Sequence, residues 1–330
     1  MCFPIFSYLI SILEYGNQIA EKMLPAAIVF RKPALWFYIL FIFCFYMKQS
    51  LRWKTIAIIC LLCALKITTY FYPNEFVMFD VGQGDSFLMR GEKTILVDTG
   101  GKLNYQKEDW QEKKTSSYAE RVIIPYLKAT GITQVDYLIL SHGDYDHMGE
   151  SIPFVERFPV RHVIFNHDSF NDLEQELIYY LKLKNIHYVQ NVTTIYAGNL
   201  RLRFLNHTLY ENENDNSQVI YLEFGKLKTL LMGDAGTKVE TDLLEHHHFQ
   251  NIDILKVGHH GSKTSTSENF IETITPQYAF ISVGKNNRYG HPDRQVLSRL
   301  KRSKIYRTDE HGSVVIRKAH NSYIIETCIH

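Results

Sequence analysis

The stretch Ser141-His142-Gly143-Asp144-Tyr145-Asp146-His147 follows an apolar run at residues 137–140, and it decides how the rest of the chain is interpreted. Its histidines and aspartates come directly after a predicted strand, where their side chains are well placed to bind a metal ion. His142 and Asp144 are two residues apart, as at a strand end, whereas Asp146 and His147 are adjacent and can face different ions. Imidazole and carboxylate ligands together suit Zn²⁺, Mn²⁺ or iron.

A second histidine group ends another predicted strand, at residues 252–257. There Gly258-His259-His260-Gly261-Ser262 places two adjacent histidines between two glycines, a pattern that seldom arises from packing alone. One histidine is predicted to bind a metal ion, and the other to contact phosphate or to deliver a proton. The sequence leaves open whether His259 or His260 is the ligand.

Two further residues are candidates for the same site. Asp234 follows the apolar residues 229–232 and Gly233, so it could bridge two metal ions or cap the helix predicted at residues 237–248. The metal motif elsewhere in the chain favours the ligand. His291, within Tyr289-Gly290-His291-Pro292, is predicted to be a ligand or a substrate contact, with a plain turn residue before proline as an equal alternative.

After residue 73 the chain alternates short apolar runs with turn residues and amphipathic segments. This pattern predicts an α/β fold with many strands and few helices, which suits a two-sheet sandwich flanked by helices. The predicted helices are residues 119–130, 172–184, 237–248, 268–274 and 294–301. The predicted strands are residues 76–79, 87–89, 94–97, 137–140, 160–165, 186–189, 200–205, 218–224, 229–232, 252–257 and 278–283.

Before residue 73 two apolar runs, residues 34–47 and 55–72, predict a transmembrane helical hairpin, with buried core helices as the alternative. Lys48, Arg52 and Lys54 lie between the runs, and the positive-inside rule places such a loop in the cytoplasm. Arg31 and Lys32, on the other side of the first run, favour the opposite orientation. Of the two placements, residues 73–330 are expected outside the cell. A further apolar stretch, residues 3–13, is predicted to form a partial or interfacial helix.

The charge is nearly balanced overall, with a formal net charge of +1 over 330 residues. Residues 285–318 nevertheless contain ten basic residues against three acidic ones. A basic rim beside a metal site would favour a phosphate-bearing substrate, and Tyr289 and Tyr306 could stack on bases. A solvated helix and strand would explain the same charges. Cys60 and Cys63 lie in an apolar run and are expected to pack rather than to form a redox pair.

Several of these segments together resemble the metallo-β-lactamase fold and, more narrowly, the hydrolase domain of the ComEC-type DNA-internalisation competence proteins. The resemblance rests on Asp80-Val81-Gly82-Gln83-Gly84-Asp85-Ser86, on Val97-Asp98-Thr99-Gly100-Gly101, and on residues 141–149, 233–235, 257–262 and 289–292. It implies an αββα sandwich at residues 73–330. It also implies that residues 1–72, with the hydrophobic transmembrane helical hairpin, are a remnant of the family's channel domain in a carboxy-terminal portion or truncated relative.

The resemblance also implies a ligand set, in which Asp144 stands where most of the superfamily has a histidine. The superfamily's middle histidine is not evident; Asn214-Asp215-Asn216-Ser217 lies near its expected place, and His207 is a weaker candidate. Such an oxygen-rich set suits one or two divalent ions, either Zn²⁺ or Mn²⁺. The implied metal ligands are His142, Asp144, Asp146, His147, Asp234 and either His259 or His260, and the implied catalytic residues are Asp146, His260 and His291.

In function, the resemblance implies a metal-dependent phosphodiesterase. It would be a nuclease that degrades the non-imported strand of DNA at the cell surface during natural transformation. Its implied partners are DNA in single-stranded form, the cell membrane and other DNA-uptake proteins. Two alternatives stay open: a hydrolase of small phosphodiesters such as phosphocholine-like headgroups, and a non-catalytic DNA-binding component of a transport complex.

Overall fold

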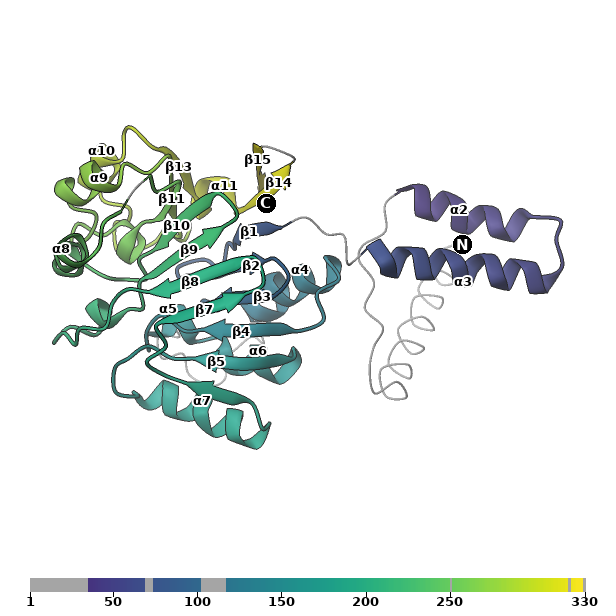
Figure 1. The fold of residues 1–330 in the computed structure, drawn as a ribbon, viewed down its shortest axis with the longest axis horizontal. Coiled ribbons are helices and arrows are strands. Elements are labelled where there is room, and N and C mark those ends of the chain that lie inside the picture. The colour runs from purple at the N-terminus through teal and green to yellow at the C-terminus, as the bar shows by residue number, and fades with distance from the viewer. Residues whose placement is uncertain (1–34, 69–73, 102–116, 250, 320–321, 329–330) are drawn as a thin grey trace, which may run out of the picture. The chain divides into compact units, whose positions relative to one another are not determined.

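The computed structural model describes residues 35–68, 74–101, 117–249, 251–319 and 322–328 (Figure 1). The chain divides into two compact units, of which the first holds the apolar helices and the second holds every strand in those ranges. The apolar stretch at residues 3–13 and the boundary predicted near residue 73 lie outside the described residues.

The first unit contains two helices that pack against each other, α2 (Leu35–Tyr46) and α3 (Leu51–Thr68). Both helices were predicted from the sequence. Among the described residues, no helix combines the length and the apolar character that crossing a bilayer requires. The helix α2 has only 12 residues, and α3 carries Arg52, Lys54 and Lys66. The predicted transmembrane hairpin is therefore not confirmed.

The second unit is built on two sheets, of eight and seven strands. The first sheet has the order β15-β14-β1-β2-β3-β4-β5-β6, and the second has the order β13-β12-β11-β10-β9-β8-β7. The strands of the first sheet are β1 (Glu75–Met78), β2 (Phe87–Arg90), β3 (Thr94–Val97), β4 (Val135–Ile139), β5 (Val160–Ile164), β6 (His187–Val189), β14 (Ser313–Ala319) and β15 (Ser322–Cys328). Those of the second are β7 (Thr194–Ala197), β8 (Leu200–Phe204), β9 (Ile220–Phe224), β10 (Leu227–Leu231), β11 (Ile254–Lys256), β12 (Tyr278–Ile281) and β13 (Lys304–Arg307).

Helices cover the outer face of each sheet (Figure 1). Those associated with the first sheet are a π-helical turn (Ala119–Ile123) that continues into α4 (Ile124–Ala129), then α5 (Tyr145–Met148), α6 (Ser151–Arg157) and α7 (Asp172–Leu183). Those associated with the second are α8 (Thr237–His246), α9 (Glu268–Ile274) and α10 (Arg294–Arg299). Short turns of helix lie at Glu213–Asn216, Gly258–Gly261 and α11 (Thr308–His311).

Three apolar clusters fill this arrangement. One lies between the sheets and joins Phe76 and Phe87 of the first to Leu222 and Phe280 of the second. The other two lie between each sheet and its helices. Because central strands are buried on both faces, their sequences read as continuous apolar runs rather than as an alternation. The predicted two-sheet sandwich flanked by helices is confirmed.

Four strands were not predicted from the sequence. The strands β7 and β13 have four residues each, and β13 places Lys304 in solvent beside charged neighbours. The strand β15 is an edge strand with mostly exposed side chains, so it lacks the apolar signal of a core strand. The fourth strand, β14, is held in the sheet by its pairing with β1 on one side and β15 on the other. Its local sequence does not indicate these pairings.

The helix α7 begins with a capping box that also places a buried carboxyl group. The side chain of Asn171 accepts a hydrogen bond from the Glu174 backbone N–H at 3.0 Å, and Glu174 Oε2 accepts one from the Asn171 N–H at 2.9 Å. The Asn171 amide also donates to the carbonyl oxygen of Gly143 at 2.9 Å, in the loop that carries the predicted ligands. Burial, with the nearby charges of Glu213 and Asp168, raises the pKa of Glu174 to about 7.

This raised pKa predicts a pH dependence of stability. The pKa of Glu174 in the folded protein lies above the ordinary value of 4.5. The contribution of Glu174 to the free energy of unfolding is therefore complete below pH 4.5 and is lost as the pH rises through about 7. Glu174→Gln keeps the acceptor and cannot ionise. Its unfolding free energy relative to wild type should therefore increase by on the order of 3 kcal/mol between pH 4.5 and pH 8.

Urea denaturation at several pH values measures this difference. Glu176→Gln is the matched control, because Glu176 is exposed on the same helix, and its curve should run parallel to that of wild type. Parallel curves for Glu174→Gln as well would contradict the expectation.

Candidate metal centre

The predicted ligands meet at one edge of the sandwich because the strands before them end there. Residues 141–147 follow β4, Asp234 follows β10, and His259 and His260 follow β11. The strands β10, β11 and β12 are parallel to one another, so their carboxyl ends share an edge. Loops at the carboxyl ends of strands are the usual place for a functional site in α/β proteins.

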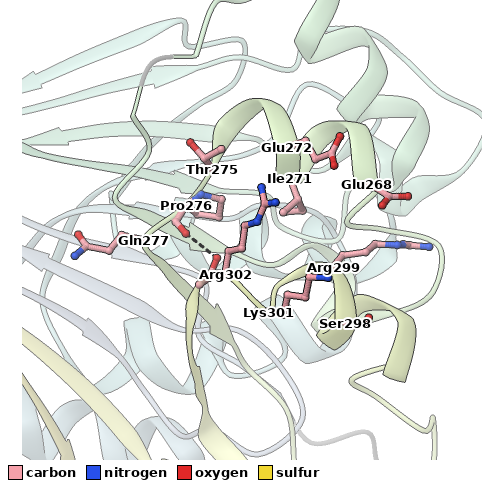
Figure 2. A pocket seen from close by; sticks show the side chains of 11 residues that line it. Glu268, Ile271, Glu272, Thr275, Pro276, Gln277, Ser298, Arg299, Lys301 and Arg302 are labelled. Carbon is pink, nitrogen blue, oxygen red and sulfur yellow. Dashed lines mark hydrogen bonds between the residues drawn. The ribbon is translucent and has the colours of Figure 1, made fainter.

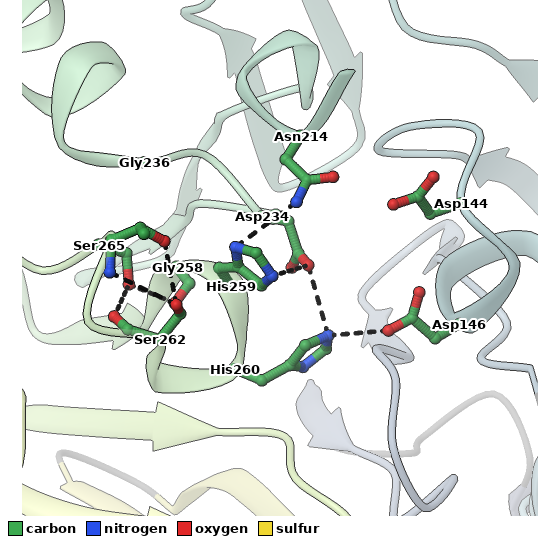
Figure 3. Close-up of polar contacts among 12 residues, drawn as sticks. Asp144, Asp146, Asn214, Asp234, Gly236, Gly258, His259, His260, Ser262 and Ser265 are labelled. Atoms are coloured by element: carbon green, nitrogen blue, oxygen red, sulfur yellow. Dashed lines mark hydrogen bonds and ion pairs between the residues drawn. The ribbon is translucent and has the colours of Figure 1, made fainter. Parts of the chain in front are cut away.

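Asp146, His147, Asp234 and His260 form a cluster in which one ligand atom of each residue lies within 4.8 Å of the others. Figure 3 shows three of them, Asp146, Asp234 and His260. Asp234 Oδ1 lies 3.2 Å from His147 Nε2, and Asp234 Oδ2 lies 3.5 Å from His260 Nε2. Asp146 Oδ2 lies 3.3 Å from His260 Nε2. Both Nε2 atoms are buried and have no hydrogen-bond partner. Buried nitrogen atoms of this kind, facing two carboxylates, fit a divalent metal ion.

The other ring nitrogen of each histidine is held by a hydrogen bond. His260 Nδ1 donates to the carbonyl oxygen of Ser282 at 2.9 Å. His147 Nδ1 lies 2.9 Å from Asp98 Oδ2, and Asp98 also accepts hydrogen bonds from the backbone N–H and the hydroxyl of Ser141, both at 2.7 Å. Partners of this kind fix the ring so that Nε2 presents its lone pair to a metal ion.

The geometry distinguishes the two adjacent histidines that the sequence left open. The His260 side chain is 2% exposed and its Nε2 belongs to the cluster. The His259 side chain is 30% exposed, and its Nε2 lies 3.8 Å from Asp234 Oδ2. Asn214 Nδ2 lies 3.5 Å from His259 Nδ1 (Figure 3). The structure therefore brings His260 into the cluster and leaves His259 at its border.

His142 and Asp144 lie beside the cluster but outside it. His142 Nε2 is buried without a hydrogen-bond partner and lies 3.5 Å from Asp144 Oδ2, whose side chain is 41% exposed. Within the described ranges, these two residues belong to no group of three ligand atoms. Ser217 Oγ lies 3.3 Å from His142 Nδ1, while His207 is exposed and bonds to the Phe204 carbonyl oxygen. An ion at His142 and Asp144 would thus have a poorer ligand set than one in the cluster.

The structure excludes the helix-cap alternative for Asp234. The helix α8 begins at Thr237 with Gly236 as its N-cap residue, two residues after Asp234. Asp234 is 3% exposed, and its backbone N–H donates to Ser217 Oγ at 3.0 Å. Its carboxylate is therefore directed into the cluster rather than used at the helix end.

Three buried charged residues around the cluster were given no role from the sequence. Asp85 and Asp98 are each 1% exposed, and with His147 they form a second, inner group of ligand atoms. Lys256 is 0% exposed; its Nζ donates to the carbonyl oxygen of Gly233 at 2.5 Å, lies 3.4 Å from Asp234 Oδ1 and forms an ion pair with Asp85. A lysine on the inward face of an apolar strand, two residues after Ile254, is the signal that could have identified it.

The loop that carries Asp85 packs closely against the loop of the predicted ligands. The backbone N–H of Asp85 donates to the Asp146 carbonyl oxygen at 3.2 Å. Gly84 has a φ of +135°, and a Cβ atom there would lie 2.1 Å from the same carbonyl oxygen. Only glycine allows this approach of the two backbones.

A pocket of about 390 Å³ opens from the cluster to solvent. Besides cluster residues, it is lined by Gln83, Asp144, Tyr145, Tyr289, His259 and His291. The rings of Tyr289 and His291 are stacked, with centroids 5.9 Å apart. Burial and the neighbouring His259 and His260 lower the pKa of His291, which favours the neutral form of this ring.

Charges in the cluster couple its protons to metal binding. Burial alone would lower the pKa of His147 and His260, but Asp234, with Asp98 or Asp146, raises the pKa of both rings. Burial alone would raise the pKa of Asp146, yet the neighbouring rings of His260 and His147 lower it. A metal ion binds only the neutral imidazole, so it competes with a proton for each Nε2 atom.

A second hollow, of about 380 Å³, lies at the opposite ends of β12 and β13, between α9 and α10 (Figure 2). Its lining mixes basic and acidic side chains, among them Arg299, Arg302, Glu268 and Glu272. None of the cluster residues lines it. It is therefore separate from the candidate metal centre.

Comparisons with known proteins identify the family of this fold. The family model of the metallo-beta-lactamase superfamily matches residues 79–285. ComE operon protein 3 of Bacillus subtilis is 36% identical over 77% of this chain and 35% of its own length. Recombination protein 2 of Haemophilus influenzae is 34% identical over 68% of this chain and 26% of its own length. Competence protein ComA of Neisseria gonorrhoeae is 29% identical over 72% of this chain and 31% of its own length. The chain thus spans about a third or less of these relatives.

The difference between the adjacent histidines gives a test of the site. His260→Ala removes an Nε2 atom from the cluster and should lower the affinity for Mn²⁺ by about 100-fold or more, whereas His259→Ala should lower it by less than about tenfold. Isothermal titration of the metal-free proteins with MnCl₂ measures both, with circular dichroism to check the fold. Equal losses in the two variants would contradict the assignment.

Proposed function

The chain belongs to the metallo-β-lactamase superfamily, and on that premise we propose that residues 73–330 form a metal-dependent phosphodiesterase that cuts DNA at the cell surface during DNA uptake. The observation that carries the proposal is the buried group Asp146, His147, Asp234 and His260, which opens into a pocket. The chain needs no serine or cysteine nucleophile for this chemistry. Similarity to a protein named competence protein ComA supports the link to DNA uptake.

The chain's own residues have distinct parts in this proposal. A divalent ion held by the cluster would supply a Lewis acid for a phosphoryl oxygen and would lower the pKa of an attacking water. Asp146 is 19% exposed at the pocket, so its carboxylate can orient that water. His259 and His291 line the pocket, and their rings can hydrogen-bond to phosphoryl oxygens as charge develops. Asp98 holds the His147 ring in place throughout.

We further propose that the favoured metal is Mn²⁺ and that one ion binds more tightly than a second. The tighter position has two carboxylates and two imidazoles, from the cluster. The weaker position has His142 and the half-exposed Asp144, with the Ser217 hydroxyl near the place of the missing histidine. Oxygen-rich ligand sets favour harder ions over Zn²⁺.

The pocket wall supports a substrate with planar bases. Tyr289 is 49% exposed and lines the pocket, with the exposed Lys285 and Arg288 close to it in the chain. Aromatic rings beside basic side chains are typical of sites that bind single-stranded nucleic acid. The suggestion that Tyr306 stacks on bases is wrong, because its ring is 5% exposed and packs against Phe280 in the core.

The basic rim is also smaller than its sequence suggests. Arg307 forms ion pairs with Asp309 and Glu310. Arg317 pairs with the buried Glu75 and with Glu326, on the strand pair at the far end of the first sheet. The residues proposed to guide a DNA backbone are therefore those next to the pocket rather than the whole of residues 285–318.

A nuclease assay tests this proposal. The purified chain should cleave single-stranded DNA in the presence of Mn²⁺ and should lose this activity in EDTA. Asp146→Asn should lower the cleavage rate by at least about 100-fold, because it removes a carboxylate from the cluster. Asp172→Asn is the matched control: Asp172 is exposed on α7 and does not line the pocket.

The same assay separates the alternatives. Tyr289→Leu should raise the KM for DNA and leave the hydrolysis of bis(p-nitrophenyl) phosphate unchanged. Turnover of glycerophosphocholine with intact DNA would instead establish a headgroup hydrolase. Binding of single-stranded DNA without cleavage under Mn²⁺, Zn²⁺ or Mg²⁺, together with an inert Asp146→Asn, would establish a transport component.

We also propose that residues 1–72 attach the chain to the membrane and that residues 73–330 lie outside the cell. Apolar side chains of α2 and α3 support the attachment, since Leu35 is 76% exposed, Phe43 60% and Leu51 80%. The basic residues between and at the start of these helices, Lys48 in the loop and Arg52 in the first turn of α3, support the orientation.

Protease added to intact cells that express the chain should therefore digest the strand-containing unit. Immunoblotting against that unit follows its loss, and a cytoplasmic marker protein serves as the control for lysis. Protection of the unit until the cells are broken would overturn the outside placement.

A further inference from the structure

Lys256 is a fully buried lysine at the end of β11, and its side chain points between the two sheets. Its ammonium group has three N–H donors and three partners: the carbonyl oxygen of Gly233 at 2.5 Å, Asp234 Oδ1 at 3.4 Å, and Asp85. A buried ammonium group is costly unless all its donors are paired. Here every donor is used, and two of the three partners are carboxylates.

The surroundings of Lys256 have the composition of a metal site. Asp85, Asp98 and His147 form an inner group of ligand atoms within 4.8 Å of one another. Asp98 is occupied by Ser141 and by His147 Nδ1. Asp85 is the remaining carboxylate, and the Lys256 ammonium group lies against it. The inner group therefore already contains a positive charge that belongs to the chain.

We propose that Lys256 is a built-in cation that occupies the inner side of this carboxylate cluster, so that divalent ions bind only on the outer side of Asp234. Lys256 is thus a positioning residue, because it acts through Asp85 and Asp234 rather than on a substrate. The inference rests on the metal-ligand assignment of the proposed function. It adds a reason why the number of bound ions is limited, namely that Lys256 already occupies the inner side.

The two oxygens of Asp234 show how the positioning works. Oδ1 lies 3.4 Å from Lys256 Nζ and 3.2 Å from His147 Nε2. Oδ2 lies 3.5 Å from His260 Nε2 and faces the pocket residues. The ammonium group fixes Oδ1 toward the interior, and this leaves Oδ2 on the outer side with His260 and Asp146.

The charge also ties the two sheets together. Lys256 comes from the second sheet, whereas Asp85 comes from the loop between β1 and β2 of the first. Removal of one partner of a buried ion pair is strongly destabilising because it leaves the other charge uncompensated. Without Lys256, Asp85 would keep only the rings of His147 and His260, whose Nδ1 atoms lie 3.8 and 3.7 Å away and are already bonded to Asp98 and Ser282. A bound cation could then take the place of the ammonium group.

Substitution of Lys256 by methionine tests the proposal, since methionine keeps much of the side-chain length and removes the charge. In EDTA, Lys256→Met should lower the Tm by on the order of 10 °C, because the buried Asp85 loses its ammonium partner. With saturating MnCl₂, the variant should bind about one more Mn²⁺ per chain than wild type, measured by plasma mass spectrometry after desalting. Lys263→Met is the matched control at an exposed position and should change neither quantity.

A second variant covers the case in which Lys256→Met fails to fold. Asp85→Asn with Lys256→Met removes both charges, so it should be more stable in EDTA than either single variant and should bind no additional Mn²⁺. The proposal is overturned if Lys256→Met has the wild-type Tm and the wild-type metal content. It is also overturned if the double variant is no more stable than Lys256→Met.

These measurements are independent of DNA cleavage. If the chain binds Mn²⁺ and cuts no DNA, the nuclease proposal is refuted. The number of Mn²⁺ ions bound by wild type and by Lys256→Met then still tests the role of Lys256. A chain that binds no metal refutes the metal centre, and the stability of the four metal-free proteins still shows whether Lys256 compensates Asp85.

Discussion

The structure depends on the balance of buried negative charge at the shared edge of its two sheets. Asp85, Asp98 and Asp234 are each at most 3% exposed, and Asp146 lies beside them. Carboxylates cannot remain ionised in such a place without nearby positive charge or hydrogen-bond donors. The imidazole of His147 meets this need across the sandwich, because Nδ1 contacts Asp98 and Nε2 contacts Asp234. The fold and the candidate site therefore share one set of contacts.

Much of the candidate site could be predicted from the sequence because its residues follow the ends of apolar strands within a few positions. The loop after β4 supplies Asp146 and His147, and the loop after β10 supplies Asp234. The sequence of one strand and its loop does not show which side chains of the other loops lie opposite. The choice between His259 and His260 depends on left-handed backbone at both residues, and local sequence does not specify that conformation.

Other features were hidden because they depend on contacts between distant segments. In the sequence Lys256 is a single charge in an apolar strand. Its partner Asp85 lies in a distant loop and meets Nζ only when the two sheets pack together. Tyr306 looked like a surface aromatic residue because its neighbours in sequence are basic, yet pairing of β13 with β12 turns its ring into the core. The sandwich itself was predictable from strand number, but the order of strands within each sheet was not.

The pairing of β1 with β14 has a consequence for how the protein is made. Glu75 on β1 pairs with Arg317 on β14, 242 residues later in the chain. While the chain is being synthesised, β1 has β2 on one side and an open edge on the other, and contacts of such long sequence separation form late. An open edge offers unpaired backbone groups to any other strand, including β14 of a second copy. Until this sheet closes, newly made molecules are therefore open to strand exchange at β1.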